Sequence, residues 1–240
     1  MLTREKFINS PIEIEFELLH LLDKNAALTI FDIGACEAED SIRYSNLFPH
    51  AKVYAFEPRP DNCAKAVELI KNYKKQSIYL EQLALSNQNG KATFYLSEGQ
   101  PETIKDTKNW DYGNKSSSLL PPSEEMKKHT EWLQFKNKIE VETMKLSDYV
   151  FKNKISSIDF AHMDVQGAEL MVLEGAGNFL SKIKIVWLEV EVVELYKDQP
   201  LKNVIEQFME RNEFTNVLNK VDAISGDQLY VNRNYFSSEK

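Results

Sequence analysis

Residues 31–41 read FDIGACEAEDS and continue an apolar run that begins at Leu28. The run predicts a buried strand from Leu28 to Ile33, because a short apolar segment that ends at a glycine is typical of a parallel strand. The residues that follow predict a helix from Ala38 to Phe48. A strand, a small-residue loop and a helix in this order form a common nucleotide-binding position in open α/β sheets.

Strands alternate with helices over most of the chain, which predicts a mostly parallel sheet covered on both faces. The further strands are expected at Lys52–Phe56, Ser77–Leu83, Ile158–Val165 and Ile183–Val190. The further helices are expected after a cap at Asp61 and at Leu146–Phe151, Ala168–Leu180 and Leu201–Arg211. The last two strands, Phe214–Asn219 and Gln228–Asn232, are expected to pair antiparallel. The fold class is therefore α/β, with a helical segment at residues 1–27 and one domain at residues 28–240.

A β-hairpin insertion interrupts this alternation. Asn89-Gly90 is a favoured hairpin turn, and it precedes the alternating strand Lys91–Leu96. Ile139–Met144 alternates in the same way, so the two strands are expected to pair. Residues 97–138 are too many for an ordinary hairpin connection, and loops of that length are usually functional or disordered. A short helix is expected within them at Ser123–Phe135.

Composition argues against several classes of protein. The chain has 240 residues and a formal net charge of −8, which is poorly suited to binding the phosphate backbone of nucleic acids. Glu13, Glu15 and Glu17 interrupt the apolar N-terminal part, which therefore does not resemble a secretory signal. No apolar run is long enough to span a membrane. Cys36 and Cys63 form neither a CxxC pair nor a metal motif, so we expect a reducing, cytoplasmic location and no metal. No feature of the sequence specifies an oligomeric state.

Carboxylates surround the loop after the first predicted strand. Asp32, Glu37, Glu39 and Asp40 would all repel an approaching pyrophosphate, and only Gly34 fits the glycine pattern of a dinucleotide fingerprint. S-adenosylmethionine carries an ammonium and a sulfonium group, so the acidic loop favours it over NAD. Glu39 and Asp40 are also explained by a solvated helix start that complements the helix dipole.

Acidic residues and a histidine mark the ends of later strands, where ligands bind in open parallel sheets. Glu57 follows the second strand and is placed to accept hydrogen bonds from both hydroxyls of a ribose. His162 and Asp164 share one strand face, and Asp164 lies nearer the carboxyl end; a hydrogen-bonded core histidine is an equal alternative for His162. Glu169 and Glu189 are further candidates, with a helix cap and a solvated strand edge as their alternatives.

These motifs together resemble the FkbM-type methyltransferases, a branch of the S-adenosylmethionine-dependent class I methyltransferases. The resemblance runs from about Thr29 to Glu191 through FDIGACEAEDS, VYAFEP, LALS, NGKATFY, SSSL, HMDVQGAELMVLEGA and WLEV. It implies a single Rossmann-like domain and a set of cofactor-binding residues: Asp32, Gly34, Ala35, Cys36, Glu57, Pro58, Ala84 and Leu85. The chain departs from the family pattern GANxG at Cys36 and Ala38, and it has His162 where the family commonly carries lysine.

The function that the resemblance implies is O-methyl transfer from S-adenosylmethionine to a hydroxyl of a small molecule or glycan. Asp164 and His162 are the candidate catalytic residues. The insertion at residues 97–138 is expected to cover the acceptor as a lid, with aromatic surface from Trp110, Tyr112, Trp132 and Phe135. The residues expected to contact the acceptor are Ser117, Ser118, Glu169 and Glu189. The alternatives are an NAD-dependent oxidoreductase and a non-catalytic Rossmann-like binding module.

Overall fold

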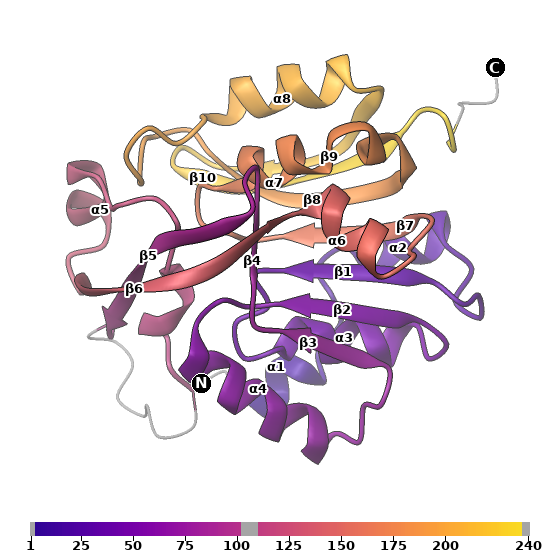
Figure 1. Cartoon of the computed structure of the whole chain (residues 1–240), viewed down its shortest axis with the longest axis horizontal. Coiled ribbons are helices and arrows are strands. Elements are labelled where there is room, and N and C mark those ends of the chain that lie inside the picture. Colours follow the sequence, from indigo (N-terminus) through magenta and orange to yellow (C-terminus); the bar gives the residue numbers. More distant parts are fainter. Residues whose placement is uncertain (1–2, 102–109, 237–240) are drawn as a thin grey trace.

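A seven-stranded sheet in the order β3-β2-β1-β7-β8-β10-β9 forms the centre of the molecule, as Figure 1 shows. The computed structural model describes residues 3–101 and 110–236. The parallel strands are β1 (Thr29–Ile33), β2 (Lys52–Phe56), β3 (Ile78–Glu81), β7 (Ile158–Met163) and β8 (Ile183–Glu191). β10 (Ser225–Asn232) runs antiparallel to both β8 and β9 (Phe214–Val221). The predicted α/β class, mostly parallel sheet and antiparallel C-terminal pair are confirmed.

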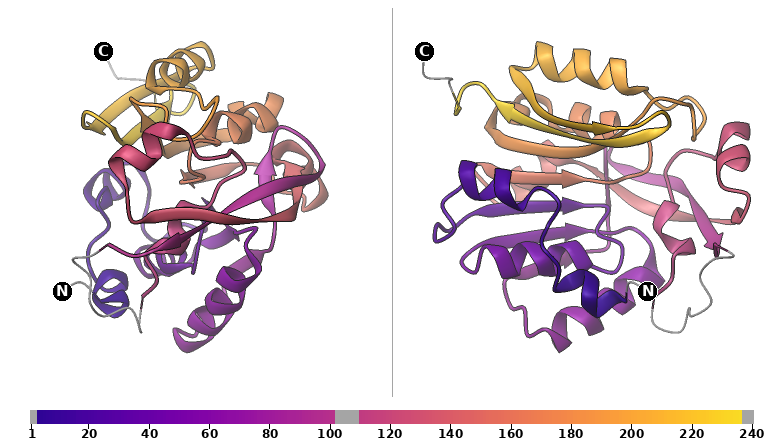
Figure 2. Two further views of the ribbon diagram at one scale, coloured as in Figure 1. Left: turned by 90° about the vertical axis from the view of Figure 1, so that its left-hand side faces the viewer. Right: turned by 180° about the vertical axis from the view of Figure 1, so that it is seen from behind.

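Helices cover both faces of this sheet because neighbouring strand residues point to opposite sides. Figure 2 shows the N-terminal helices against one face. That face carries α1 (Arg4–Ile8), α2 (Glu15–Leu21), α3 (Glu39–Leu47) and α4 (Pro60–Asn72), and the other carries α6 (Leu146–Lys152), α7 (Glu169–Ala176) and α8 (Lys202–Arg211). Ile30 packs with the first group, whereas Phe31 packs with the second. The two short helices within residues 1–27 bury Ile8 and Leu18 in the same cluster as Ile30.

A second, three-stranded sheet lies beside the carboxyl ends of the main sheet (Figure 1). Its strands are β4 (Ala84–Ser86), β6 (Leu133–Lys145) and β5 (Gly90–Gly99), in that order. The predicted pairing of Lys91–Leu96 with Ile139–Met144 is confirmed, since Ala92 lies opposite Val141. The predicted strand Ser77–Leu83 is confirmed over β3 but runs two residues too far, because β3 ends at Glu81 and the chain then crosses to the second sheet.

The predicted hairpin at Asn89-Gly90 is wrong. β4 and β5 flank this turn, but both pair with β6, β4 in parallel and β5 antiparallel. The Asn89 side chain instead accepts a hydrogen bond from the Lys145 amide at 2.8 Å, which fixes the turn to the end of β6. The turn sequence therefore predicts where the chain reverses, but it does not predict that a distant strand, β6, lies between the two flanking segments.

The insertion between β5 and β6 folds back and pairs again with β5. Residues 102–109, within the predicted insertion at residues 97–138, lie outside the described residues. The described part contains a 3-10 helix, η1 (Gly113–Ser116), and α5 (Glu124–His129), which is shorter than predicted because residues from Leu133 onward join β6. Ser118 pairs with Tyr95, and Pro122 pairs with Tyr196.

Two other helix ends also differ from prediction. α4 begins at Pro60, with no side-chain cap from Asp61. α7 ends at Ala176 because Gly177 turns into a 3-10 helix, η2 (Gly177–Lys182). Within residues 3–101 and 110–236, no helix is long and apolar enough to cross a membrane.

The order of the main sheet reverses at β1, which has β2 on one side and β7 on the other. In open α/β sheets the ligand crevice opens outside the carboxyl ends of the strands at such a switch point. The ends of β1, β2 and β7 therefore define where the site must lie.

Candidate active site

The loop after β1 touches the end of β7 through its backbone. The Asp164 amide donates a hydrogen bond to the Ile33 carbonyl at 2.9 Å. A Cβ atom on Gly34 would lie 1.8 Å from the Asp164 carbonyl oxygen, and Gly34 has a φ of +91°. Only glycine fits here, because the lack of a Cβ atom lets the backbone of Asp164 pack directly against the loop.

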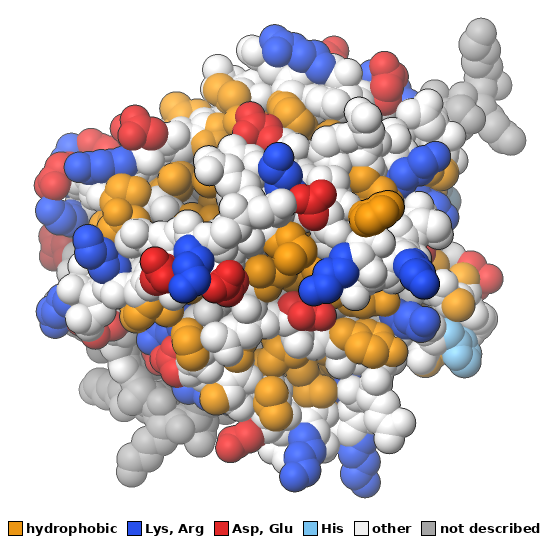
Figure 3. Space-filling view, in the orientation of Figure 1, with side chains coloured by type: hydrophobic (Ala, Val, Ile, Leu, Met, Phe, Trp, Pro, Cys, Tyr) orange, Lys and Arg blue, Asp and Glu red, His pale blue; other side chains and the backbone are white. Residues whose placement is uncertain are grey.

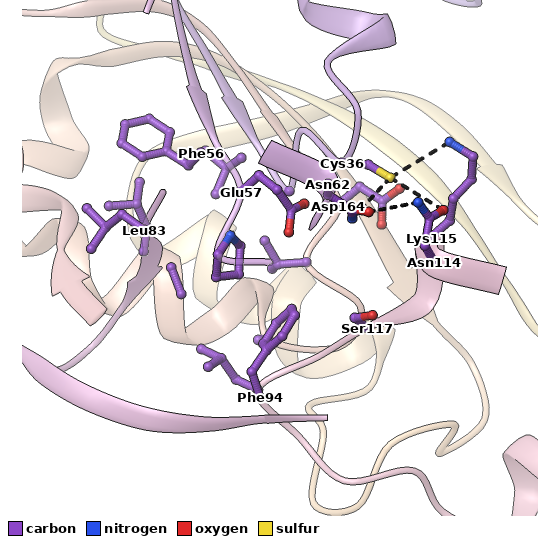
Figure 4. Close-up of a pocket in the computed structure, with 18 residues that line it drawn as sticks. Cys36, Phe56, Glu57, Asn62, Leu83, Phe94, Asn114, Lys115, Ser117 and Asp164 are labelled. Carbon is purple, nitrogen blue, oxygen red and sulfur yellow. Dashed lines mark hydrogen bonds between the residues drawn. The ribbon is translucent and has the colours of Figure 1, made fainter. Parts of the chain in front are cut away.

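Pocket A opens beside this contact, between β2 and the insertion. Figure 4 shows Phe56 and Leu83 at one end and Asn114 and Lys115 at the other, with Glu57 between them. The predicted site residues that line it are Gly34, Cys36, Glu57, Pro58, Ala84, Leu85, Ser117 and Asp164. Its other walls are Ile33, Phe56, Asn62, Leu83, Phe94, Asn114, Lys115, Leu119, Val165 and Ala168. The structure thus gathers most of the predicted cofactor residues in one pocket.

Glu57 is a buried carboxyl group at the end of β2, with 5% of the residue exposed. One of its oxygens accepts a hydrogen bond from the Arg59 amide at 2.7 Å. The Arg59 guanidinium turns away to pair with Asp61 at 2.6 Å. Burial raises the pKa of Glu57 to about 8, against the opposing effect of the Arg59 amide. A buried carboxyl of this kind gains from hydroxyl donors that a ligand brings.

Amide groups form the polar end of pocket A. Asn114 donates one hydrogen bond to Asn62 and another to Glu37, each at 2.7 Å. Burial raises the pKa of the Cys36 thiol beside them, so this group stays a neutral thiol. The sequence did not single out Asn62 or Asn114, and no motif in it marks them, because they lie in a helix start and in the insertion.

Two of the loop carboxylates hold the site together instead of facing solvent. Glu37 is fully buried and binds Arg4 of α1 and Lys65 of α4, the second at 2.8 Å. Glu39 is 3% exposed and accepts the indole N–H of Trp110 at 2.7 Å. The expectation of a solvated helix start is therefore wrong for Glu39, because the N-terminal helix and the insertion cover it.

Pocket B lies on the other side of the Gly34 loop. It shares Gly34, Cys36, Lys115 and Asp164 with pocket A. Its remaining walls are Phe7, Asp32, Ala35, Glu39, Asp40, Trp110, Tyr112 and His162. Asp32 and Ala35, which the sequence assigned to the cofactor, thus line pocket B and not pocket A.

Asp32 and His162 form a hydrogen-bonded pair in pocket B. His162 Nδ1 lies 3.2 Å from one Asp32 oxygen, and the Ser41 hydroxyl donates to the other. Burial lowers the pKa of His162, but the hydrogen bond and charge of Asp32, with the charges of Asp40 and Asp164, outweigh it and raise the pKa to about 9. The pairing gives the imidazole a fixed orientation.

A network of side chains holds Asp164 at the junction of the two pockets. Gln166 donates to Asp164 at 2.5 Å and to Glu189 at 2.9 Å, and Tyr196 donates to Gln166 at 2.8 Å. Glu169 accepts the Val165 amide at 2.9 Å. Glu169 and Glu189 line neither pocket, and burial raises the pKa of both.

The two serines of the predicted acceptor contact have different surroundings. Ser117 lines pocket A and accepts the Ser97 amide at 3.0 Å. Ser118 is fully buried, lines neither pocket, and donates to the Gln166 carbonyl at 2.7 Å. Of the predicted aromatic lid residues, Trp110 and Tyr112 reach pocket B, whereas Trp132 and Phe135 pack beside Tyr196. Among the described residues, no group of three or more His, Cys, Asp or Glu side chains is arranged to hold a metal ion.

Sequence comparisons place the chain in a family. The model of the methyltransferase FkbM domain matches residues 32–215. The chain belongs to the FkbM methyltransferase family. This FkbM-family chain is 31% identical to 2-O-methyltransferase NoeI of Sinorhizobium fredii (strain NBRC 101917 / NGR234) over 198 residues, which cover 82% of the chain and 77% of NoeI.

Solved structures agree with the FkbM fold. Methyltransferase FkbM from Methylobacillus flagellatus KT matches with a TM-score of 0.52 and 13% identity, over 95% of the present chain and 50% of that chain. The present chain thus spans half the length of that protein. An rRNA methylase from Streptococcus thermophilus matches with a TM-score of 0.50 and 13% identity, over 94% of the present chain and 98% of that chain. At such identities these likenesses show the fold alone.

Proposed function

We propose that this FkbM-family protein transfers a methyl group from S-adenosylmethionine to a hydroxyl oxygen of a small molecule or glycan. The observation that carries the proposal is the meeting of Glu57, the Gly34 loop and Asp164 in pocket A. The family supports methyl transfer. The name of NoeI, a 2-O-methyltransferase, supports oxygen as the methyl acceptor.

The residues of pocket A fit S-adenosylmethionine. The carboxyl of Glu57 would accept the ribose hydroxyls, and the apolar side chains at that end would hold the adenine: Phe56, Leu83, Leu85, Phe94 and Leu119. Gly34 leaves its backbone open to close approach, since any Cβ there would collide with Asp164. Asp32 and Asp40 place negative charge next to the loop, which favours a cationic ligand over a pyrophosphate. When bound, this cofactor supplies an electrophilic methyl group on a good leaving group.

The chain's own residues must then orient the acceptor hydroxyl and manage one proton. An alkyl hydroxyl has a pKa of about 16, so it is far too weak an acid to lose its proton to a histidine before methyl transfer begins. Proton loss must therefore accompany formation of the new bond. Asp164 lies between the two pockets and can accept both the hydroxyl hydrogen bond and the proton. His162, oriented by Asp32, has a pKa of about 9, so it is protonated near neutral pH and can take the proton only in the fraction of molecules in which it is neutral.

The position of the insertion supports its predicted role as a lid over the acceptor. It supplies Trp110 and Tyr112 to pocket B, and Lys115 to both pockets. Ser117 contributes from the same segment to pocket A, so the acceptor and cofactor would meet under one stretch of chain. We propose that the described part of residues 97–138 closes over the bound molecules. Three residues outside the pockets would hold this arrangement through hydrogen bonds to Val165 and Gln166, next to Asp164 in the chain: Ser118, Glu169 and Glu189.

We propose that nucleic acid is not the acceptor. Positive and negative side chains are interspersed, with apolar side chains between them, among the described residues on the face in Figure 3. Binding to phosphate backbones requires clustered Lys and Arg. The carboxylates of pocket B would also oppose a polyanion.

Binding and transfer can be tested separately. A thermal-shift comparison of S-adenosylmethionine, S-adenosylhomocysteine and NAD should show stabilisation by the first two alone. Incubation with S-adenosylmethionine and a panel of glycans and metabolites should then add one CH₂ unit to an acceptor by mass spectrometry. Stabilisation by NAD alone would favour the oxidoreductase, and binding without any methyl transfer would favour a non-catalytic module.

A further inference from the structure

Three aromatic rings form a continuous wall along pocket B. Phe7 of the N-terminal helix lies 5.2 Å from Trp110, and Trp110 lies 5.2 Å from Tyr112, measured between ring centroids. The Trp110 indole is fixed by its hydrogen bond to Glu39. Arg43 lies over the Phe7 ring at 4.2 Å, and Lys115 lies over the Trp110 ring at 5.1 Å. These contacts hold the wall rigid, which reduces the entropy cost of binding a ligand against it.

Carboxylates dominate the polar side of the same pocket. Asp32, Glu39, Asp40 and Asp164 line it, against the cationic Lys115 and the imidazole of His162. Lys115 is already engaged with Glu39 at 3.5 Å. Arg43 pairs with Asp40 at 2.6 Å, and His162 pairs with Asp32 at 3.2 Å. Among the described residues, Asp164 is thus the lining carboxylate without a cationic partner, and its charge would repel an incoming anion in a partly desolvated cavity.

We infer that pocket B is the acceptor chamber and takes an uncharged ring that carries hydroxyl groups, and that it rejects anionic acceptors such as phosphorylated rings or nucleic acid. Such a ring presents an apolar C–H face, which packs on an aromatic wall, and hydroxyl donors at its edge, which suit carboxylate oxygens. Asp164 lies at the passage to pocket A and would orient the reacting hydroxyl there. The inference rests on the proposed function, since it assumes that pocket A holds the cofactor.

The wall also makes the N-terminal helix part of the acceptor chamber. Arg4 binds Glu37 and lies 3.4 Å from Glu39, so α1 is joined to the same loop that borders pocket A. Phe7 projects from this helix into pocket B, far in sequence from every motif of the strand ends. Phe7 is therefore a specificity-determining residue that can be changed without touching the cofactor pocket.

The test follows the Trp110 indole by NMR. The chain has three tryptophans, so a Trp110→Phe variant assigns the indole signal, and Trp187 in the core serves as an internal reference. The protein saturated with S-adenosylhomocysteine is titrated with methyl glycosides of the common hexoses, deoxyhexoses and pentoses and with myo-inositol. Glucose 6-phosphate and a short oligouridylate are the anionic probes. We expect at least one uncharged ring to shift the Trp110 signal, and the anions to bind at least about tenfold more weakly.

Two variants separate the acceptor chamber from the cofactor pocket. Phe7→Ala and Tyr112→Ala should each weaken binding of the uncharged ring at least about fivefold. Calorimetric affinity for S-adenosylhomocysteine should stay within about twofold of the parent. Phe16→Ala is the matched control, because Phe16 is 80% exposed and stacks on His20 outside the chamber. It should change neither affinity.

Each other result contradicts the inference in a distinct way. No shift with any uncharged ring, or tighter binding of an anion, would show that pocket B is not such a chamber. A loss of S-adenosylhomocysteine binding in both aromatic variants, with their folds intact by circular dichroism, would assign pocket B to the cofactor. Failure of the parent protein to bind S-adenosylhomocysteine at all would instead contradict the proposed function.

Discussion

Pockets A and B lie on two sides of one loop, yet they are built from different kinds of residue. Pocket A draws Gly34, Glu57, Ala84 and Leu85 from the ends of strands and the connections that follow them. Pocket B adds Phe7 from the N-terminal helix and two aromatic residues from the insertion. The cofactor side of the proposed enzyme thus combines local strand–loop–helix patterns with Asn114, Lys115 and Ser117 of the insertion. The acceptor side depends on the insertion too, and in addition on the N-terminal helix, which only the tertiary fold brings there.

Asp164 lines both pockets, so its substitution tests whether they act together. We expect Asp164→Asn to lower kcat by about 10²–10⁴-fold, because the amide keeps an acceptor oxygen at the junction but cannot take the proton of the acceptor hydroxyl. His162→Ala should cause a smaller loss. Affinity for S-adenosylhomocysteine, measured by calorimetry, should change less than about threefold in both variants. A larger kcat loss for His162→Ala would reverse the two roles.

Glu57→Ala tests pocket A alone. The ribose hydroxyls that donate to Glu57 would stabilise its ionised form against the burial that raises its pKa to about 8. Loss of the carboxyl should therefore weaken S-adenosylmethionine binding by about 100-fold or more, since hydrogen bonds to a charged group contribute about 1.5–3 kcal/mol each. Calorimetry gives the affinity, and thermal denaturation checks the fold. Glu57→Gln, which keeps the shape and one acceptor, should lose less. If Glu57→Ala binds the cofactor as tightly as the parent, the ribose assignment is wrong.

Asp32→Asn tests the electrostatics of pocket B. Asp32 supports the raised pKa of His162, so without its charge burial should dominate and the pKa should fall from about 9 to below the ordinary value for histidine. A raised pKa in the folded state gives stability that is fully present below the unfolded pKa and is lost as pH rises through about 9. In the variant this loss of stability above neutral pH should disappear.

NMR titration of the imidazole signals measures this effect, with His162→Gln to assign one of four histidines. The charges that face His162 also include Asp40 and Asp164. Burial raises the pKa of Asp227 to about 6, against the opposing effect of the His162 charge. Asp40→Asn is therefore the control, with a smaller expected decrease. An unchanged pKa in Asp32→Asn would show that Asp32 does not control the imidazole.

The smallest effect is expected at Cys36, which lies between the two pockets. Its φ of +49° is in the left-handed region, which asparagine tolerates and β-branched residues do not. Cys36→Asn, the residue of the family pattern, should change the free energy of unfolding by less than about 1 kcal/mol, whereas Cys36→Val should cost about 1–2 kcal/mol. Urea denaturation measures both. Equal stability of the two variants would contradict the account of backbone strain.

Several features of this protein were determined by the sequence alone. The apolar run into Gly34, the prolines after Glu57 and the alternating helices and strands predicted a mostly parallel α/β sheet, and its strand ends marked the residues of pocket A. These signals are local, since a buried strand, a glycine turn and a strand-end carboxylate are each specified within about ten residues. The FkbM resemblance rests on the same local motifs in their order.

Only the tertiary structure decided the rest. The pairing of β4 and β5 with β6, the burial of Glu37 and Glu39, and the placement of Asp32 beside His162 all depend on contacts between residues far apart in the chain. Phe7 and Trp110 meet because Arg4, Glu39 and the Trp110 indole satisfy one another's charges and hydrogen bonds once the helix and the insertion are packed. Such partners have no fixed spacing in sequence, because burial and pairing are properties of the folded chain.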